Sequence, residues 1–389
     1  MKEKHAHRIR YIMLLLSFLP LLYFPLYNEL FPLIHKRCTD QAHVNVPFPK
    51  FDLKHLDKFP KQFSDYFDDT LKIKDKLILL NSLFKIQVLN LSSINSKVII
   101  GSNGWLFLKN DPLNYYQNKN PYTLDELDSL RTILKRRAKW ANDQGLKFYM
   151  VIAPNKHFIY TEHLPSEFHK SPGTDRTDRL IDFMKYDSEV NIIDLRDVLL
   201  QHKSPIPLYY KTDNHWNFLG AYYGYTEIIN RVKKDFPTVG SPIKLDSFKI
   251  DSSEVRAGME SMMIDMEEWY TDNRIKLIPK FKEKGLDGKK MNYKFDGWFP
   301  YPDDYEIDKE TGDSTKPSIV VIRDSYTDFL IPLMKEHFKR SVYIFDAWRY
   351  KENRNIISKE KPNIVMLIVL DNAIGGITLN DFLEDQKID

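Results

Sequence analysis

Short apolar runs and amphipathic segments alternate along the chain between residues 124 and 370. The apolar runs, rich in Val, Ile and Leu, cover residues 147–153, 190–194, 317–322, 341–345 and 364–370. Apolar residues recur three and four apart in the segments 124–143, 174–186, 218–232, 327–337 and 351–358, a spacing that predicts helices. Strands that are apolar on both faces and alternate with helices are typical of a parallel sheet covered on both sides. The sequence therefore predicts an α/β fold in which helices sandwich a parallel sheet.

Two segments depart from this alternation. Residues 97–108 contain two short apolar stretches around a Gly-Ser-Asn-Gly turn, which predicts a β-hairpin. Residues 234–316 are dense in Lys, Asp, Glu and Tyr and show no sustained period. We therefore expect an irregular insertion at about 234–316, either a cover over a functional site or a small β-rich cap.

The N-terminus combines a basic start with a long apolar stretch. Residues 1–10 carry four Lys and Arg side chains, and residues 11–27 carry no charge. The stretch 11–34 is long enough to cross a bilayer, which needs about 20 residues. No small-residue cleavage site follows it, which favours a membrane anchor over a cleaved signal peptide. We expect a single-pass protein of the inner membrane with a cytoplasmic tail at 1–10, an extracytoplasmic helical stalk at 35–95 and a folded domain at 96–389.

Composition argues against several classes of protein. The chain has 57 basic and 54 acidic residues and a net charge of +3, with the two signs interspersed, so charge gives no reason to expect nucleic-acid binding. The single cysteine, Cys38, excludes an internal disulfide and a cysteine-ligated metal cluster. The histidines are dispersed, and no HExxH, phosphate-loop or dinucleotide-binding motif occurs. We expect neither a metal nor a cofactor.

A carboxylate and an imidazole stand two residues apart in Lys-Thr-Asp-Asn-His-Trp-Asn, at residues 211–217. Residues two apart on an extended segment project to the same side, so Asp213 can orient His215. An imidazole held by a carboxylate is the general base of a catalytic triad. Taken singly, Asp213 is more often a helix cap and His215 a packed, hydrogen-bonded side chain. A suitably placed nucleophile would favour the catalytic interpretation.

Such a nucleophile follows the strand predicted at 317–322. Ser325 lies where this strand leads into a helix, and reactive groups gather at the carboxyl ends of the strands in sheets of this type. The N–H groups at the start of that helix would face a developing oxyanion. A serine in this position can also be a simple helix cap. Together with Asp213 and His215, however, it predicts a Ser-His-Asp triad.

Three blocks of sequence resemble the SGNH-hydrolase-like proteins of polysaccharide acetylation. They are Gly-Ser-Asn-Gly-Trp-Leu-Phe at 101–107, Thr-Asp-Asn-His-Trp-Asn at 212–217 and Arg-Asp-Ser-Tyr at 323–326. The resemblance is to the periplasmic alginate O-acetyltransferases and to the proteins named for an Asp-His-His-Trp motif, and it extends from about residue 51 to the C-terminus. It implies an SGNH-like catalytic domain at 96–389 with a circularly permuted motif order, because the Asp-x-His block precedes the serine.

This resemblance implies a membrane-anchored O-acetyltransferase that acetylates hydroxyls of an extracytoplasmic polysaccharide through an acyl-serine intermediate. Ser325 would be the nucleophile, His215 the base and Asp213 its orienting group. Because acetyl-CoA is cytosolic, the resemblance also implies a membrane-bound O-acyltransferase partner that supplies the acetyl group. Two alternatives stay open: a carbohydrate acetyl esterase with the same triad, and a non-catalytic glycan-binding or assembly protein.

Five further residues are candidates for substrate binding. Lys156, Arg349 and Tyr350 follow predicted strands, where they could bind an anionic sugar or orient a carbonyl. Trp216 adjoins the base and could stack on a sugar ring. Arg323 stands two residues before the nucleophile, where relatives often have a small residue. Surface solvation of the charged side chains and a core position for Trp216 are equally open.

Overall fold

The computed structural model describes residues 11–20, 23, 27, 48–49, 57–70, 81, 84, 97–170, 173–256, 258–264, 266, 269–295, 299, 301–346 and 353–377. The chain divides into two compact units. One comprises residues 1–95 and 262–266, and the other comprises residues 96–261 and 267–389. All the residues of the predicted triad belong to the second unit.

The first unit contains the amphipathic helix α2 (Phe59–Thr70). Phe48 packs edge-on against two rings of this helix, with centroid distances of 6.1 Å to Phe63 and 5.1 Å to Tyr66. Half of the membrane anchor predicted at 11–34 lies outside the described residues, which include 11–20, 23 and 27. Among the residues that are described, no helix is both long and apolar enough to cross a membrane.

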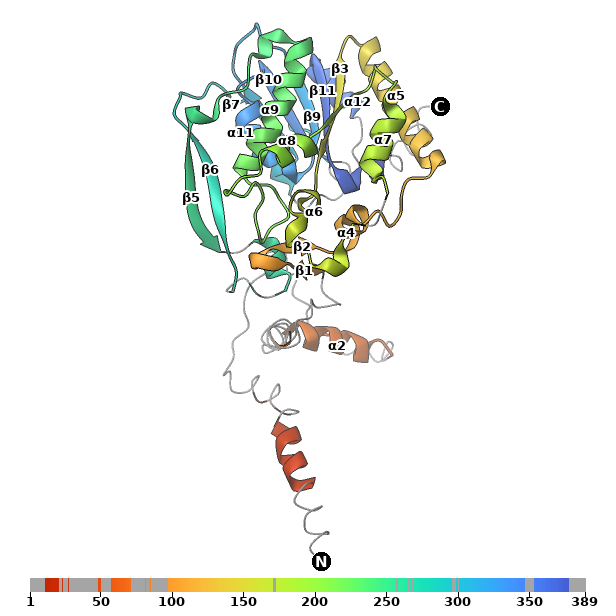
Figure 1. Ribbon diagram of the computed structural model, residues 1–389, viewed down its shortest axis with the longest axis vertical. Helices are drawn as coiled ribbons and strands as arrows, with labels where there is room; N and C mark the ends of the chain where they lie inside the picture. Colours follow the sequence, from red (N-terminus) through yellow and green to blue (C-terminus); the bar gives the residue numbers. More distant parts are fainter. Residues whose placement is uncertain are drawn as a thin grey trace, which may run out of the picture. The chain divides into compact units, whose positions relative to one another are not determined.

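A seven-stranded sheet forms the centre of the second unit, in the order β4-β3-β11-β9-β10-β8-β7 (Figure 1). Its first five strands are parallel, as predicted. They are β4 (Asn191–Asp194), β3 (Lys147–Ala153), β11 (Ile364–Leu370), β9 (Ile319–Arg323) and β10 (Arg340–Phe345). The strand β9, which precedes Ser325, therefore lies near the middle of the sheet.

The sheet is mixed rather than wholly parallel, which corrects the prediction. Strand β8 (Glu306–Glu310) runs antiparallel to β10, and β7 (Leu286–Asp287) runs antiparallel to β8. Both strands come from the segment 234–316, which is consequently not irregular throughout. Arg340 of β10 binds the carboxylates of Asp308 and Glu310 on β8, at 2.5 and 2.6 Å. These ion pairs explain how a charged segment without an apolar pattern can extend the sheet at its edge.

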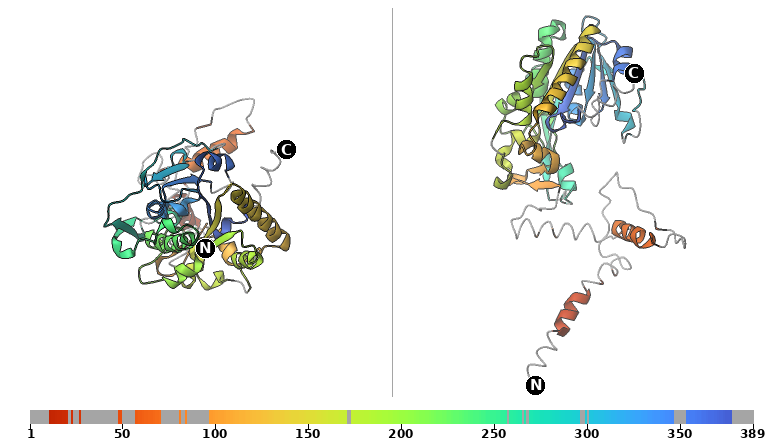
Figure 2. Two further views of the ribbon diagram at one scale, coloured as in Figure 1. Left: turned by 90° about the horizontal axis from the view of Figure 1, so that it is seen from above. Right: turned by 90° about the vertical axis from the view of Figure 1, so that its right-hand side faces the viewer.

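Helices cover both faces of the sheet (Figure 2). The buried residues of β3, β11, β9 and β10 alternate between two core clusters. On β3, Tyr149 and Val151 belong to one cluster, and Met150 and Ile152 belong to the other. The first cluster includes residues of α8 (Arg196–Gln201), α9 (Phe218–Asp235) and α11 (Ile331–Met334). The second includes residues of α5 (Leu124–Asp143), α7 (Arg176–Met184) and α12 (Arg354–Glu360).

The helix predicted at 327–337 is shorter than expected. The structure has a 3-10 turn, η9 (Ser325–Phe329), followed by the short helix α11. Pro332 explains the difference, because proline has no N–H and its ring would clash with the carbonyl four residues earlier in a continuous helix. It is tolerated in the first turn of α11.

Two hairpins and three short α-helices are also present among the described residues, together with several 3-10 turns. The predicted hairpin at 97–108 is confirmed: β1 (Val98–Ile100) pairs antiparallel with β2 (Leu106–Leu108). A longer hairpin, β5 (Phe248–Arg256) with β6 (Thr271–Pro279), also comes from the segment 234–316. The short helices are α4 (Asn110–Tyr116), α6 (Lys156–Ile159) and α10 (Met259–Met262).

Candidate active site

Asp324 fixes the turn that carries the serine. It caps η9, because its Oδ1 accepts a hydrogen bond from the Tyr326 N–H at 3.0 Å. Its Oδ2 accepts a hydrogen bond from the N–H of Leu370, the last residue of the neighbouring strand β11, also at 3.0 Å. With both carboxylate oxygens engaged in this way, Asp324 holds the turn against the end of β11 and leaves Ser325 half-buried at the carboxyl edge of the sheet.

The predicted base lies within hydrogen-bond distance of this serine. His215 Nε2 is 2.8 Å from Ser325 Oγ, and His215 Nδ1 is 2.6 Å from Asp213 Oδ1. The same Asp213 oxygen accepts a hydrogen bond from the His215 backbone N–H at 3.0 Å. The structure thus brings the three residues into one hydrogen-bonded chain in the order of a serine-hydrolase triad.

The loop 207–217 presents Asp213 and His215 from the start of α9. Its two arms are joined by the Tyr209–Trp216 bridge and by the hydrogen bond from Tyr210 N to His215 O at 3.2 Å. Asn217 closes the loop, because its Nδ2 donates to Pro207 O at 2.6 Å. Its Oδ1 caps α9 by accepting from the backbone N–H groups of the first turn. Asn217 therefore both closes the loop and caps the first turn of α9.

Two hydrogen bonds connect this loop to the turn of the nucleophile. The indole N–H of Trp216 donates to Tyr326 O at 2.9 Å, and the Tyr326 hydroxyl donates to Asn214 O at 2.5 Å. Trp216 has no exposed surface, so the expectation that it stacks on a sugar ring is wrong. Its ring is part of the core, and its one polar atom holds the loop 207–217, called the base loop below, against η9, the serine turn.

The charges of Asp213 and His215 stabilise each other. Burial raises the pKa of Asp213, but the hydrogen bond and charge of His215 outweigh it and bring that pKa to about 2. Burial likewise lowers the pKa of His215, but the hydrogen bond and charge of Asp213, joined by the charges of Glu260 and Asp324, raise it above its ordinary value. The imidazolium that forms when His215 takes a proton is therefore favoured at this position.

The backbone at Gly258 and Met259 packs against Asp213 and binds its second carboxylate oxygen. The Met259 N–H donates to Asp213 Oδ2 at 3.2 Å, and the Gly258 N–H donates to Thr212 Oγ1 at 2.7 Å. A Cβ at Gly258 would lie 2.6 Å from Asp213 Cβ, closer than two carbons can approach without movement. The lack of a side chain at residue 258 is what allows the backbone to approach the carboxylate.

We expect Gly258→Ala to lower kcat about 10- to 100-fold while shifting Tm by only a few degrees, because Asp213 must move and small displacements of a catalytic group are costly. Gly376→Ala is the matched control, since a Cβ there meets no atom within 4 Å. Hydrolysis of an activated acetyl ester measures the effect. Equal kcat in the two variants would contradict the positioning of Asp213 by this glycine.

The structure also corrects the roles predicted for Lys156 and Arg323, because both side chains are buried. Lys156 Nζ donates to three backbone carbonyls of the base loop, as described below. Arg323 Nη1 binds Asp328 Oδ1 at 2.6 Å and its Nη2 donates to Asp304 O at 2.9 Å, while its guanidinium lies over the Phe345 ring. Neither side chain is placed to bind a substrate.

Arg349 and Tyr350, the other two substrate-binding candidates, lie outside the described residues. Their predicted role remains a prediction that the described part of the structure does not address.

Asn372, which follows β11, was not among the predicted site residues. Its Oδ1 accepts a hydrogen bond from Asn155 Nδ2 at 2.7 Å, which directs its own amide N–H groups elsewhere. The end of β11 is held beside the serine turn by the Leu370–Asp324 hydrogen bond. An available signal was the position of Asn372 just past a buried strand, at the same sheet edge as Ser325. Recognising it required knowing that β9 and β11 are neighbours.

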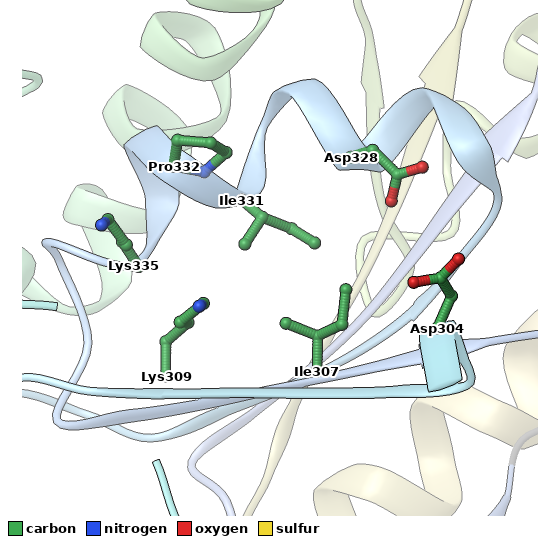
Figure 3. A pocket seen from close by; sticks show the side chains of 7 residues that line it. All are labelled: Asp304, Ile307, Lys309, Asp328, Ile331, Pro332 and Lys335. Atoms are coloured by element: carbon green, nitrogen blue, oxygen red, sulfur yellow. The ribbon is translucent and has the colours of Figure 1, made fainter. Parts of the chain in front are cut away.

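A pocket of about 360 Å³ adjoins the serine turn. Figure 3 shows two carboxylates at one end, two lysines at the other and isoleucine side chains between them. Its lining residues are Asp304, Ile307, Lys309, Asp328, Ile331, Pro332 and Lys335. Asp328 belongs to η9, the turn that begins with Ser325, so the acidic end is the one nearer the nucleophile along the chain. Buried Arg323, which contacts Asp328 and Asp304, holds the two walls of this end together.

A comparison with known protein families matches residues 98–256 to the SGNH hydrolase-like domain of the acetyltransferase AlgX. The match includes Asp213 and His215 and ends before Ser325. A search of curated proteins finds no match.

Solved structures with a similar fold cover most of the chain. A structure of Bacillus cereus PatB1 with a sulfonyl adduct has a TM-score of 0.54 at 18% identity, covering 73% of this chain and 97% of that one. A second PatB1 structure has a TM-score of 0.53 at 16% identity, covering 73% and 99%. The O-acetyltransferase domain of Pseudomonas putida AlgJ has a TM-score of 0.47 at 14% identity, covering 72% and 93%. The family match confirms the predicted resemblance: residues 98–256 are similar to the SGNH hydrolase-like acetyltransferase domain of AlgX, and the PatB1 structures show that the chain shares their fold.

Proposed function

We propose that this protein is an O-acetyltransferase that moves an acetyl group from a donor to a hydroxyl of an extracytoplasmic polysaccharide through an acyl-serine intermediate. The observation that carries the proposal is the hydrogen-bonded chain from Asp213 through His215 to Ser325 Oγ. The match to an acetyltransferase domain over residues 98–256 supports the choice of acyl group.

In the first half-reaction, Ser325 Oγ attacks the acetyl carbonyl of the donor and His215 Nε2 accepts the hydroxyl proton. Asp213 keeps the Nδ1–H directed toward itself and stabilises the imidazolium. Collapse of the tetrahedral intermediate breaks the bond to the leaving group, which receives the proton from His215. In the second half-reaction a sugar hydroxyl attacks the carbonyl of the acetyl-serine and His215 takes the hydroxyl proton. The second tetrahedral intermediate then breaks its bond to Ser325 Oγ, which receives the proton from His215, so that the acetylated sugar leaves and the enzyme is regenerated.

Two groups are suited to stabilise the oxyanion of these intermediates. The Ser325 N–H stands at the first position of η9, where helical turns leave N–H groups without an internal partner. The side-chain amide of Asn372 is the second, because it lies just past the end of β11 with its oxygen already bound by Asn155. In the proposed mechanism these two donors replace the hydrogen bonds that water would give a developing negative charge.

The pocket beside η9 is the proposed acceptor site. Its isoleucine and proline side chains offer an apolar surface for the C–H face of a sugar ring, and the carboxylates of Asp304 and Asp328 can accept hydrogen bonds from sugar hydroxyls. An acceptor bound there would present a neighbouring hydroxyl to the acetyl group on Ser325.

The predicted anchor at 11–34 belongs to the same proposal. It would hold the domain on the extracytoplasmic side of the inner membrane, where the polysaccharide is accessible. A membrane-bound O-acyltransferase partner would then deliver the acetyl group from the cytosolic side.

The test is an assay of the purified extracytoplasmic part with an activated acetyl ester, with and without polysaccharide fragments. We expect ester consumption to rise with acceptor and acetylated sugar to accumulate in proportion. Consumption that is independent of every acceptor, with acetate as the product, would identify an esterase instead. Lack of turnover together with intact glycan acetylation in cells carrying Ser325→Ala would point to a non-catalytic glycan-binding protein.

A further inference from the structure

Beneath the base loop lies a fully buried pair of opposite charges that the proposed mechanism does not use. Lys156 is the first residue of α6, and Glu260 lies on α10. Their side chains are 1% and 0% exposed, and Lys156 Nζ is 3.9 Å from Glu260 Oε1. Burying charges is costly, so a pair retained this close to a catalytic loop calls for an explanation.

Lys156 is bonded to the loop itself. Its Nζ donates to Tyr210 O at 3.2 Å, to Lys211 O at 3.3 Å and to Asp213 O at 2.8 Å. An ammonium group has three protons to donate, and these carbonyls are three converging acceptors. One ammonium group thus satisfies all three carbonyls at this buried point. Lys156 therefore fixes the backbone from which the Asp213 carboxylate and the His215 ring project.

Glu260 also contacts this loop. Its backbone N–H donates to Thr212 O at 3.1 Å, but neither side-chain oxygen has a hydrogen-bond partner within the described part of the structure. The charged form of such a carboxylate depends mainly on nearby charge, with a smaller contribution here from the backbone N–H of Glu260 itself. The positive groups available to it are Lys156 and His215, and both contribute to holding Glu260 in its charged form.

We propose that Lys156 and Glu260 are positioning residues of the triad: Lys156 shapes the base loop, and Glu260 is the counter-charge that keeps Lys156 and the His215 imidazolium charged. The proposal rests on the function proposed above for Ser325, His215 and Asp213. Asp213 holds the imidazole by contact, and Glu260 adds a second negative charge at longer range. Asp213 Oδ1 accepts from both the ring and the backbone N–H of His215, and Glu260 adds to the negative charge that acts on the ring.

The charged groups around Glu260 set its titration. Lys156 faces it from α6, Asp213 and His215 face it from the loop, and Tyr326 of η9 is also within electrostatic reach. Asp272 of β6 faces Lys156. Burial raises the pKa of Glu260 to about 7, the charge of Lys156 opposes this rise, and the charge of Asp213 adds to it. Glu260 therefore carries its negative charge above pH 7 and loses it as the pH falls through 7, whereas a glutamate with the ordinary pKa of 4.5 would still be charged there.

Glu260→Gln tests the charge with almost no change of shape. We expect kcat/KM to fall about tenfold at pH 8, and the acid limb of its pH profile to move down by about 0.5 to 1 pH unit, because the His215 imidazolium loses a neighbouring negative charge. Glu336→Gln is the control, because this buried carboxylate accepts hydrogen bonds from Lys284 and Gly285 and should change Tm without moving the limb. If the acid limb of the kcat/KM profile lies at the same pH in Glu260→Gln as in the parent protein, the proposal is overturned.

A pair of substitutions separates positioning from stability. Lys156→Met alone leaves Glu260 unpaired and should lower both Tm and kcat. In Lys156→Met with Glu260→Leu the buried charges are gone, and replacing a buried ion pair by apolar side chains often restores stability. We expect the double variant to regain Tm while kcat stays at least about 10-fold low, because the loop carbonyls have lost their donor. Recovery of kcat together with Tm would mean that the pair is only structural.

An NMR titration of the His215 ring distinguishes failure of this inference from failure of the proposed function. The expected result is a lower His215 pKa in Glu260→Gln than in the parent protein, whether or not either protein turns over an acetyl ester. If the parent protein transfers no acetyl group but the His215 pKa is still lower in Glu260→Gln, only the proposed function is contradicted. If the parent protein transfers acetyl groups but the His215 pKa is the same in Glu260→Gln, only the role of Glu260 is contradicted.

Discussion

Replacing Ser325 by alanine is expected to reduce both acetyl transfer and ester hydrolysis by a factor on the order of 10³ or more, since the variant can form no acyl-enzyme. The hydroxyl is half-buried, and its hydrogen bond in the described structure is to His215 Nε2. Removing it leaves the core untouched, so Tm should stay within a few degrees of the parent value. The measurement is kcat for acetyl transfer, with mass spectrometry of the protein quenched during turnover. The parent protein should carry one acetyl group on Ser325, and the variant none.

Ser102 provides a matched control for this experiment. Its Oγ also lies 3.0 Å from a histidine nitrogen, Nδ1 of His163, but the His163 ring is stacked on Trp105. Ser102→Ala removes a hydroxyl from a second Ser–His pair and is expected to leave kcat unchanged. A sulfonyl fluoride should label Ser325 and spare Ser102, because activation of a serine requires an oriented base. Full activity in Ser325→Ala, or an acetyl group found on Ser102, would assign the nucleophile elsewhere.

The parts of the fold that were predictable are those with local signals. Helix α5 begins at residue 124 because Thr123 and Glu126 form a capping box, and it ends before Gly145, which adopts a positive φ of 74°. Both signals can be recognised in the sequence without knowing any tertiary contact. Strands β3 and β11 were equally clear, because buried parallel strands are apolar on both faces.

The sheet edge was not predictable because its pairing depends on distant charges. Strand β8 reads Glu-Ile-Asp-Lys-Glu, which has no apolar pattern, and its partner Arg340 is about thirty residues away. An edge strand needs only one neighbour and tolerates charged side chains. Nothing in the sequence of residues 306–310 alone distinguishes such a strand from a solvated loop.

The site divides in a similar way. The motifs predicted that Ser325, His215 and Asp213 would meet, since each lies beside a recognisable strand or helix. The motifs could not predict that Lys156 and Arg323 are buried, because a cation at a strand end usually extends into solvent. Their burial depends on acceptors that tertiary structure supplies: loop carbonyls more than fifty residues away for Lys156, and Asp304 O for Arg323.

Asp213→Asn is expected to lower kcat by roughly 10⁴-fold at neutral pH, the scale seen when a triad carboxylate becomes an amide. The amide can donate toward His215 Nδ1, which favours the tautomer with the proton on Nε2. That tautomer cannot accept the Ser325 proton. Asp251→Asn is the control, because this carboxylate is on β5, with a side chain that is 43% exposed, and should leave kcat unchanged.

Two pH dependences follow from the same substitution. In the parent protein kcat/KM should fall as the pH drops through the pKa of His215, which Asp213 helps to raise above 6.5. In Asp213→Asn the residual activity should persist to lower pH, because the imidazolium has lost its carboxylate. Stability gives the second dependence: the pKa of Asp213 is about 2 when folded against an ordinary 3.8, so its ionised form stabilises the native state above pH 3.8.

That contribution should disappear as the pH falls from 3.8 through 2, where the folded carboxyl takes up its proton. The difference in free energy of unfolding between parent and Asp213→Asn should therefore shrink over this window. Denaturant unfolding at several pH values measures the difference. If the difference in free energy of unfolding stays constant down to pH 2, Asp213 stabilises the loop without its charge. The Asp213 carboxylate would then not stabilise His215 by charge attraction.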